Sequence, residues 1–296
     1  MSRCKGPSAV NATSPTVGRH IFMTRSDIRK ALNEAQNAAQ AVGLIMQREL
    51  GNAKVIKESH AHDIKLALDE ECQRLIERRL QRVFPEIPIL GEEGDAGDTQ
   101  QDLRWVVDPI DGTVNFTHGI PHACVSIALQ KKVATPPQKT TVYPDGFLTL
   151  AGVVYDPFTR EIWTAYQGGP ARLNGRVVRV SSRTRMAEAI VAVGFSKSPT
   201  IIRKTLAVLQ RLSHRVRKVR MMGAAALSLA YVASGRMDLY LEPGVRLWDI
   251  AAGALLVECA GGRFECRPLR GNHRYWMLGE NGLLGDELRK SLRSLW

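Results

Sequence analysis

Two aspartates, Asp108 and Asp111, lie in residues 105–116, where an apolar strand runs into the sequence Asp-Pro-Ile-Asp-Gly-Thr. Pro109 fixes its own φ and removes a backbone donor, which predicts that the chain leaves the strand in a set direction with both carboxylates on one side. Gly112 permits close approach of the backbone to a ligand. Carboxylates beside backbone N–H groups suit a hard cation together with a phosphate. The simpler interpretation is a strand followed by an Asx turn and a helix N-cap.

Two further acidic positions favour the metal interpretation. Glu92 lies in the run Gly-Glu-Glu-Gly, directly after the short apolar segment 87–90. A carboxylate at the end of a short strand is a natural ligand for a hard cation. Asp249 lies in the segment Trp-Asp-Ile-Ala-Ala-Gly, ahead of an apolar run. Asp249 alone would most often be a helix N-cap, but the three acidic segments together predict a metal site.

Hydrophobic spacing predicts the helices that must position these residues. Ser26 is predicted to cap an amphipathic helix that ends near Leu50, and a second helix is predicted over about 68–84. An Ala-rich helix is predicted after Gly223. Gly223 permits close approach of the backbone to a ligand, although tight helix packing gives the same sequence.

Strands are predicted where apolar residues alternate between turn residues, at 124–130, 152–155 and 161–165, with a hairpin around Asn174 and Gly175. Strands grouped with helices on their outside indicate an α+β layered fold. The segment 131–149 contains two prolines in a row and a Pro-Asp-Gly turn. It is predicted to form a long, solvent-exposed hairpin.

Residues 1–22 are polar and basic and are predicted to be a disordered tail, with an organelle-targeting peptide as the alternative. The rest of the chain is long and apolar enough to bury a substantial core, as one large domain or two tightly joined halves. No apolar stretch approaches the ~18 residues of a membrane span. The five cysteines are widely spaced and are predicted to be reduced thiols, which favours a cytoplasmic protein.

With these residues in place, the chain resembles the inositol monophosphatase family of magnesium-dependent, lithium-sensitive phosphatases. The resemblance runs from about Ser26 to the C-terminus. It rests on both family signatures, at residues 108–113 and 248–253, with the Gly-Glu-Glu element ahead of them. It implies a layered α-β-α-β-α sandwich of the sugar-phosphatase type and a homodimer. It also implies that residues 23–296 form one catalytic domain, whose metal-binding half ends near residue 155 and whose C-terminal half completes the pocket.

The resemblance also implies the ligands of two or three Mg²⁺ ions. They are acidic side chains and one backbone carbonyl: Glu92, Asp108, the carbonyl of Ile110, Asp111, Asp249 and, for a third and weaker ion, Asp63. Asp108 would bridge the first two ions. A metal lowers the pKa of its bound water; Glu92 and Thr113 would orient or deprotonate that water, with Asp111 completing the catalytic set.

On the substrate side, the resemblance implies contacts to the phosphate or the alcohol from Lys57, Asp111, Gly112, Thr113, Gly223, Ala225, Glu242 and Asp249. Glu242 suits a polyol because a carboxylate accepts hydrogen bonds from neighbouring hydroxyls. The expected reaction is hydrolysis of inositol 1-phosphate or a similar polyol monophosphate. Histidinol phosphate, fructose 1,6-bisphosphate and nucleotide 3′-phosphates stay as alternative substrates, because the signatures contact metal and phosphate rather than the alcohol.

The net charge of +12 is concentrated in two places. Seven Lys and Arg and no acidic residue fall within 203–220, and four arginines lie within 263–274. These clusters predict a solvated face that attracts anionic substrates. The alternative is a protein that contacts nucleic acid or a transcription complex, since some bacterial relatives act as accessory factors in ribosomal RNA transcription. No RNA-binding motif with interleaved aromatic residues supports that alternative.

Overall fold

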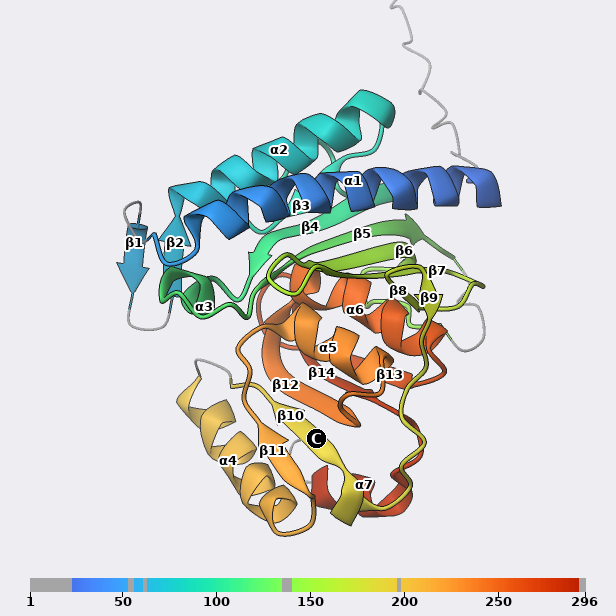
Figure 1. Cartoon of the computed structure of the whole chain (residues 1–296). Coiled ribbons are helices and arrows are strands. Elements are labelled where there is room, and N and C mark those ends of the chain that lie inside the picture. Colours follow the sequence, from blue (N-terminus) through green and yellow to red (C-terminus); the bar gives the residue numbers. More distant parts are fainter. Residues whose placement is uncertain (1–22, 53–55, 61–62, 135–139, 196–197, 293–296) are drawn as a thin grey trace, which may run out of the picture.

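Two mixed β-sheets organise the chain (Figure 1). The computed structural model describes residues 23–52, 56–60, 63–134, 140–195 and 198–292. The larger sheet has the strand order β3-β4-β5-β6-β7-β8-β9. Its strands are β3 (Ile89–Gly91), β4 (Leu103–Asp111), β5 (Cys124–Lys132), β6 (Phe147–Asp156), β7 (Glu161–Tyr166), β8 (Arg172–Leu173) and β9 (Arg176–Val177). Only β3 and β4 are parallel within it.

The smaller sheet has the strand order β11-β10-β12-β14-β13, with β10 parallel to both of its neighbours. Its strands are β10 (Ile190–Val193), β11 (Lys218–Arg220), β12 (Leu239–Arg246), β13 (Arg263–Pro268) and β14 (Arg274–Glu280). A separate hairpin joins β1 (Ile56–His60) to β2 (Asp63–Leu66). The backbone of Lys57 and Asp63 lies in this hairpin, but their side chains are outside the described part of the structure.

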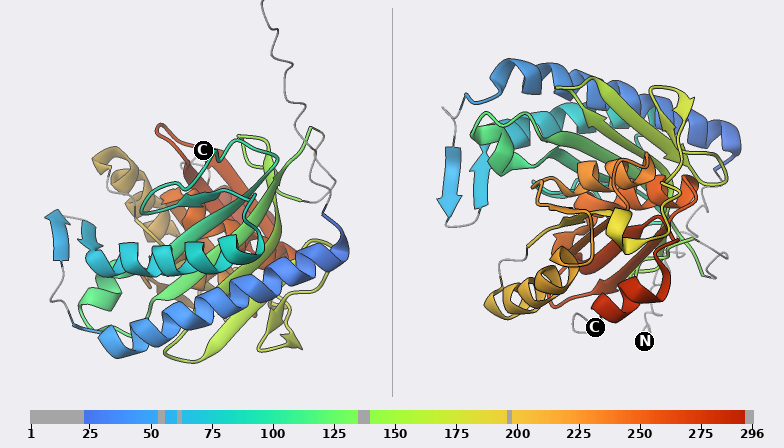
Figure 2. Two further views of the ribbon diagram at one scale, coloured as in Figure 1. Left: turned by 90° about the horizontal axis from the view of Figure 1, so that it is seen from above. Right: turned by 60° about the horizontal axis from the view of Figure 1, so that its bottom comes forward.

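Helices form three layers around the sheets (Figures 1 and 2). In chain order the helices are α1 (Arg25–Glu49), α2 (Ala67–Val83), α3 (Thr113–Thr117), α4 (Pro199–Ser213), α5 (Ala225–Ala233), α6 (Leu247–Cys259) and α7 (Gly285–Leu292), with a 3-10 turn at Met186–Glu188. Helices α1 and α2 cover the outer face of the larger sheet, α5 and α6 lie between the sheets, and α4 and α7 cover the smaller sheet.

Strand alternation explains the layers. Trp105 and Val107 of β4 pack under α1 and α2, whereas Val106 faces α5 and α6. Likewise Val191 of β10 packs with α4 and α7, whereas Ala192 faces the central helices. Each sheet is therefore buried on both faces, and the α-β-α-β-α sandwich predicted from the sequence is confirmed. No helix of the described residues is long and apolar enough to span a membrane.

The start of α1 differs from the prediction. Thr24, not Ser26, is the N-cap, and its hydroxyl accepts a hydrogen bond from the backbone N–H of Asp27 at 3.2 Å. The Asp27 carboxylate accepts one in return from the backbone N–H of Thr24 at 2.9 Å. This reciprocal capping box satisfies two backbone donors at once, so it displaces Ser26 into the first turn. Residues 1–22 lie outside the described residues.

The turn between β8 and β9 agrees with the predicted hairpin. Asn174 and Gly175 have φ values of 48° and 80°. Positive φ at both central residues matches the right-handed twist of the flanking strands, which is why Asn-Gly is favoured there.

The hairpin predicted at 131–149 is present, since β5 and β6 pair antiparallel across it, but the prediction that it is solvent-exposed is wrong. Strand β5 extends to Lys132, and β6 begins at Phe147. Tyr143 and Phe147 are buried, and Thr141 donates a backbone hydrogen bond to Glu258 of α6 at 2.8 Å. The segment therefore packs across the ends of both sheets, because its aromatic side chains bury apolar surface there. Residues 135–139 lie outside the described residues.

Arg104 anchors this segment. Its side chain is fully buried and donates two hydrogen bonds to Gln130, at 2.9 and 2.8 Å, and forms an ion pair with Asp145. Its guanidinium lies 3.7 Å from the centre of the Phe147 ring. A buried guanidinium is tolerated only when it is paired and hydrogen-bonded, so Asp145 is needed to keep Arg104 in the interior.

We predict that Asp145→Ala lowers the free energy of unfolding by about 3 kcal/mol, because removing one partner leaves a buried charge without compensation. Asp95 is an exposed carboxylate, so Asp95→Ala should change this free energy by less than about 0.5 kcal/mol. Urea unfolding of both variants tests the prediction, and equal effects would contradict it.

Candidate active site

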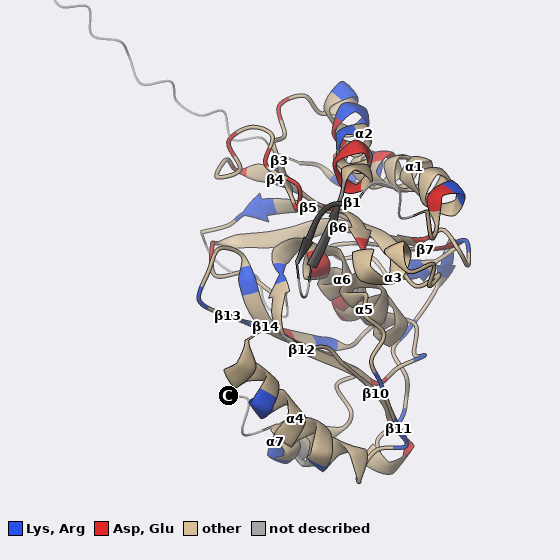
Figure 3. Cartoon of the chain, turned by 90° about the vertical axis from the view of Figure 1, so that its left-hand side faces the viewer, with Lys and Arg blue, Asp and Glu red and all other residues tan. Residues whose placement is uncertain are grey.

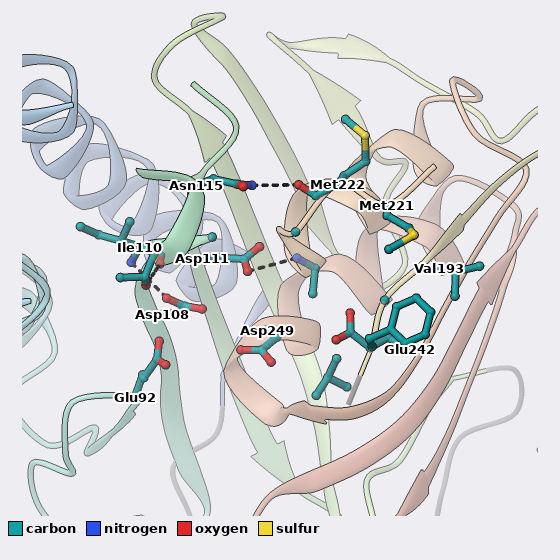
Figure 4. A pocket seen from close by; sticks show the side chains of 17 residues that line it. Glu92, Asp108, Ile110, Asp111, Asn115, Val193, Met221, Met222, Glu242 and Asp249 are labelled. Atoms are coloured by element: carbon teal, nitrogen blue, oxygen red, sulfur yellow. Dashed lines mark hydrogen bonds between the residues drawn. The ribbon is translucent and has the colours of Figure 1, made fainter. Parts of the chain in front are cut away.

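A cavity of about 420 Å³ opens where the C-terminal ends of β3 and β4 meet the N-terminal ends of α5 and α6 (Figure 4). It brings together every predicted site residue whose side chain is described: Glu92, Asp108, Ile110, Asp111, Gly112, Thr113, Gly223, Ala225, Glu242 and Asp249. Segments more than 150 residues apart in the chain therefore share one cavity. The positions of the Lys57 and Asp63 side chains are not described.

A bulge in β4 places Asp108 and Asp111 on the same cavity. Asp108 pairs with Ser126 of β5 and Asp111 pairs with Cys124, so three steps along β4 oppose two along β5. Residues three apart in a regular strand point to opposite faces, and the extra residue reverses this. The backbone N–H of Ile110 donates to Asp108 at 3.0 Å, which fixes the bulge. The convergence of both carboxylates agrees with the prediction.

Thr113 follows the bulge as the first residue of α3. Its hydroxyl donates to the carbonyl of Ile110 at 2.9 Å. Gly112 has a φ of 91°, and a Cβ at this position would lie 3.0 Å from the carbonyl oxygen of His122. Glycine is therefore required at residue 112 for both its backbone conformation and its close packing.

Asp111 accepts hydrogen bonds from across the molecule. Its two carboxylate oxygens accept from the backbone N–H groups of Ala225 at 3.1 Å and Ala226 at 2.7 Å, at the N-terminus of α5. The Cys124 thiol also donates to it, at 3.6 Å. Asp111 thus links the strand that carries the first signature to a helix of the C-terminal half. The sequence did not predict the two contacts to α5, since they join residues over 100 positions apart.

Asp249 is the third residue of α6, not its N-cap. Arg246 occupies the N-cap position, and its backbone N–H donates to the Asp249 carboxylate at 2.7 Å. The Asp249 side chain faces the cavity opposite Glu92, which follows the short strand β3 (Figure 4). A capping contact therefore holds Asp249 in place without using all of its acceptor capacity.

The carboxylates raise one another's pKa. Burial raises the pKa of Asp108 well above its ordinary value, and the charges of Glu92 and Asp111 raise it further. Burial raises the pKa of Asp111 to about 6, against the opposing effect of its backbone hydrogen bonds. Burial followed by the charge of Glu92 also raises the pKa of Asp249. Burial is the largest cause of these shifts, and repulsion from neighbouring carboxylates adds to it at Asp108 and Asp249; a bound cation would offset both effects.

The donor set fits a hard cation. Four carboxylates and the Ile110 segment line one end of the cavity, and no Lys, Arg or His is among its described lining residues. Carboxylate and carbonyl oxygens are the ligands that Mg²⁺ takes in proteins. As placed, no three His, Cys, Asp or Glu side chains in the described ranges form a finished metal cage. A bound cation would therefore have to draw these carboxylates together.

The opposite end of the cavity holds Glu242. The Tyr240 hydroxyl donates a hydrogen bond to its carboxylate, and burial raises its pKa to about 7. A Cβ at Gly194 would lie 1.8 Å from a Glu242 oxygen, so any other residue at position 194 would displace the Glu242 side chain from this place. The remaining wall is apolar and could not be predicted, because its residue types are those of an ordinary hydrophobic core: Val193, Phe195, Met221, Met222 and Val245.

Comparison with known sequences agrees with this site. The model of the inositol monophosphatase family matches residues 27–288. The Nus factor SuhB of Pseudomonas aeruginosa is 39% identical over 252 residues, which cover 82% of this chain and 87% of that protein. Inositol monophosphatase 2 of Solanum lycopersicum is 38% identical over 236 residues, which cover 77% of this chain and 84% of that protein.

The fold agrees as well. The crystal structure of the extragenic suppressor protein suhB from Bartonella henselae matches with a TM-score of 0.76 and 32% identity, over 90% of this chain and 98% of that chain. The family match covers both acidic signatures and the sheets and helices that bring them to one cavity. The chain therefore belongs to the inositol monophosphatase family.

Proposed function

We propose that this protein is a Mg²⁺-dependent phosphomonoesterase that hydrolyses inositol 1-phosphate or a similar polyol monophosphate. One observation carries the proposal: five carboxylates line a single cavity whose described lining contains no basic side chain. Such a cavity cannot attract a phosphate dianion until cations offset its charge. A site of this kind suits metal-assisted hydrolysis better than direct binding of an anion.

The metal end of the cavity would hold two ions through the residues already described. Glu92, Asp108 and the carbonyl of Ile110 supply one set of oxygens; Asp108, Asp111 and Asp249 supply the other. Mg²⁺ bound there would lower the pKa of a water molecule and offset the charge of the phosphate and the leaving alkoxide.

The chain's own groups then orient the reactants. Glu92 and the Thr113 hydroxyl both line the cavity, and the hydroxyl donates to the Ile110 carbonyl, so these two groups could orient a water or accept its proton. The backbone N–H groups of Gly112 and Thr113 are placed to donate to phosphate oxygens at the start of α3. These contacts leave the opposite end of the cavity for the alcohol.

Glu242 supports a polyol as the leaving group. Its carboxylate lies in the cavity across from the metal end and is held by Tyr240. Ionised, it accepts hydrogen bonds from neighbouring hydroxyls. Histidinol phosphate, fructose 1,6-bisphosphate or a nucleotide 3′-phosphate would meet the same metal end, so a panel of phosphate release from these esters selects among them.

A second candidate function, contact with nucleic acid, is favoured by one surface. Helix α4, strand β11 and the segment that joins them carry six exposed basic residues: Arg203, Lys204, Arg215, Arg217, Lys218 and Arg220 (Figure 3). No acidic residue occurs in the sequence between Glu188 and Asp238. Several relatives are named Nus factor SuhB. A basic surface of this kind attracts the phosphates of RNA or DNA.

We predict that Asp108→Asn abolishes phosphate release while the fold survives. The amide cannot supply the charge that two cations require, and it relieves the repulsion around Asp108. Activity on inositol 1-phosphate and the thermal midpoint are measured together. Retention of more than about a tenth of wild-type activity, a barrier change of only ~1.4 kcal/mol, would count against the two-metal assignment.

We predict that Glu242→Ala weakens catalysis on inositol 1-phosphate by about 1.5 to 3 kcal/mol for each charge-assisted hydrogen bond lost. p-Nitrophenyl phosphate has no hydroxyl for Glu242 to accept from, so its kcat/KM should change little. Equal losses on both esters would mean that Glu242 supports the fold or the metal ligands instead of the alcohol.

For the second candidate, we predict that RNA binding weakens when Arg215, Arg217 and Lys218 are all replaced by Ala. Fluorescence anisotropy with a labelled single-stranded RNA measures this at two salt concentrations. Binding that survives ~0.2 M salt and depends on these residues supports a specific partner. Binding lost at that salt in wild type leaves only non-specific attraction.

A further inference from the structure

Asn115 joins two parts of the chain at the edge of the cavity. It lies in α3, directly after the first signature, and its side-chain N–H groups donate to two backbone carbonyls. One is the carbonyl of His122 at 2.9 Å, and the other is that of Met222 at 2.8 Å. Residue 222 is distant in sequence and lies three residues before the start of α5 (Figure 4).

Close packing accompanies this tie. Gly223 has a φ of 79°, and a Cβ there would lie 3.0 Å from the Asn115 amide nitrogen. Next to it, a Cβ at Gly112 would lie 3.1 Å from the Cβ of Ala224. Residues 222–224 are therefore pressed against the turn that follows β4, and neither segment can shift alone.

The tie fixes the donors that hold Asp111. The backbone runs only three residues from the Met222 carbonyl to the N–H of Ala225, and Ala226 follows. Both N–H groups donate to the Asp111 carboxylate, at 3.1 and 2.7 Å. Displacing the Met222 carbonyl would thus move the groups that orient Asp111.

We infer that Asn115 is a positioning residue: it holds segment 222–226 in the place where the first turn of α5 orients Asp111 toward the metal end of the cavity. The inference rests on the proposed function, because it assigns Asp111 to metal binding. Asparagine is suited to the task because one amide group supplies two donors, whereas aspartate supplies none when ionised.

The test is Asn115→Leu, which keeps the approximate volume and removes both donors. Partners that orient a metal ligand typically contribute about 10- to 100-fold to metal affinity. We expect Mg²⁺ affinity, measured by isothermal titration calorimetry, to fall by that factor. The Mg²⁺ concentration for half-maximal phosphate release should rise in parallel.

Asn281 provides a matched control far from the cavity lining. Its side-chain amide also donates two hydrogen bonds, to the Ser181 hydroxyl at 3.0 Å and to the Arg183 carbonyl at 2.9 Å, and the residue is 1% exposed. Asn281→Leu should lower the thermal midpoint and leave Mg²⁺ affinity unchanged. An effect of general destabilisation would instead appear in both variants.

The outcomes separate cleanly. Unchanged Mg²⁺ affinity in Asn115→Leu, or equal losses in Asn115→Leu and Asn281→Leu, would overturn the inference. If Asn115→Leu fails to fold, Asn115→Ser keeps one donor and should lower Mg²⁺ affinity by a smaller factor; no change in the folded serine variant would also overturn it. If the wild-type protein binds Mg²⁺ but releases no phosphate, the proposed function is wrong. The calorimetric comparison would still test the inference on Asn115.

Discussion

Repulsion among carboxylates in one cavity is the constraint on which the rest of the structure depends. Asp108 and Asp111 are almost fully buried, and each raises the cost of ionising its neighbours. Such groups stay together only when the surrounding backbone holds them there. The bulge in β4, the capping contact at the start of α6 and the first turn of α5 each fix one carboxylate. These three local structures therefore hold the carboxylates in an arrangement that favours cation binding.

Much of the fold could be predicted from hydrophobic spacing, because helices and strands that bury one face repeat apolar residues at fixed intervals. The long helices α1 and α2 are of this kind. The N-cap was wrongly predicted at Ser26 because Thr24 and Ser26 are both suitable capping residues and lie two positions apart. Only the hydrogen bonds with Asp27 identify Thr24 as the N-cap. The miss at residues 131–149 has another cause. Turn residues predict a loop but do not indicate that Tyr143 is buried against Tyr275 of the smaller sheet.

The acidic end of the site could be predicted because its chemistry requires particular residue types in short, dense motifs. Asn115, Cys124 and Tyr240 could not, because they act on other residues through contacts that arise only after folding. Residue type and spacing alone did not indicate the contacts that Asn115 and Tyr240 make. Their roles depend on which distant backbone or side chain arrives beside them. Residues that would contact the metal or the substrate can be recognised from short sequence motifs. Residues that hold them in place cannot.

Two residues on the apolar side of the cavity, Glu242 and Met221, differ in how tightly their surroundings constrain them. Glu242 accepts a hydrogen bond from Tyr240 and lies so close to Gly194 that any side chain at residue 194 would displace it. Met221, on the same wall, is 62% exposed and little constrained by packing. Substitution at residue 221 would therefore reshape this wall with little loss of packing, whereas substitution at residue 242 would remove the carboxylate that Tyr240 holds.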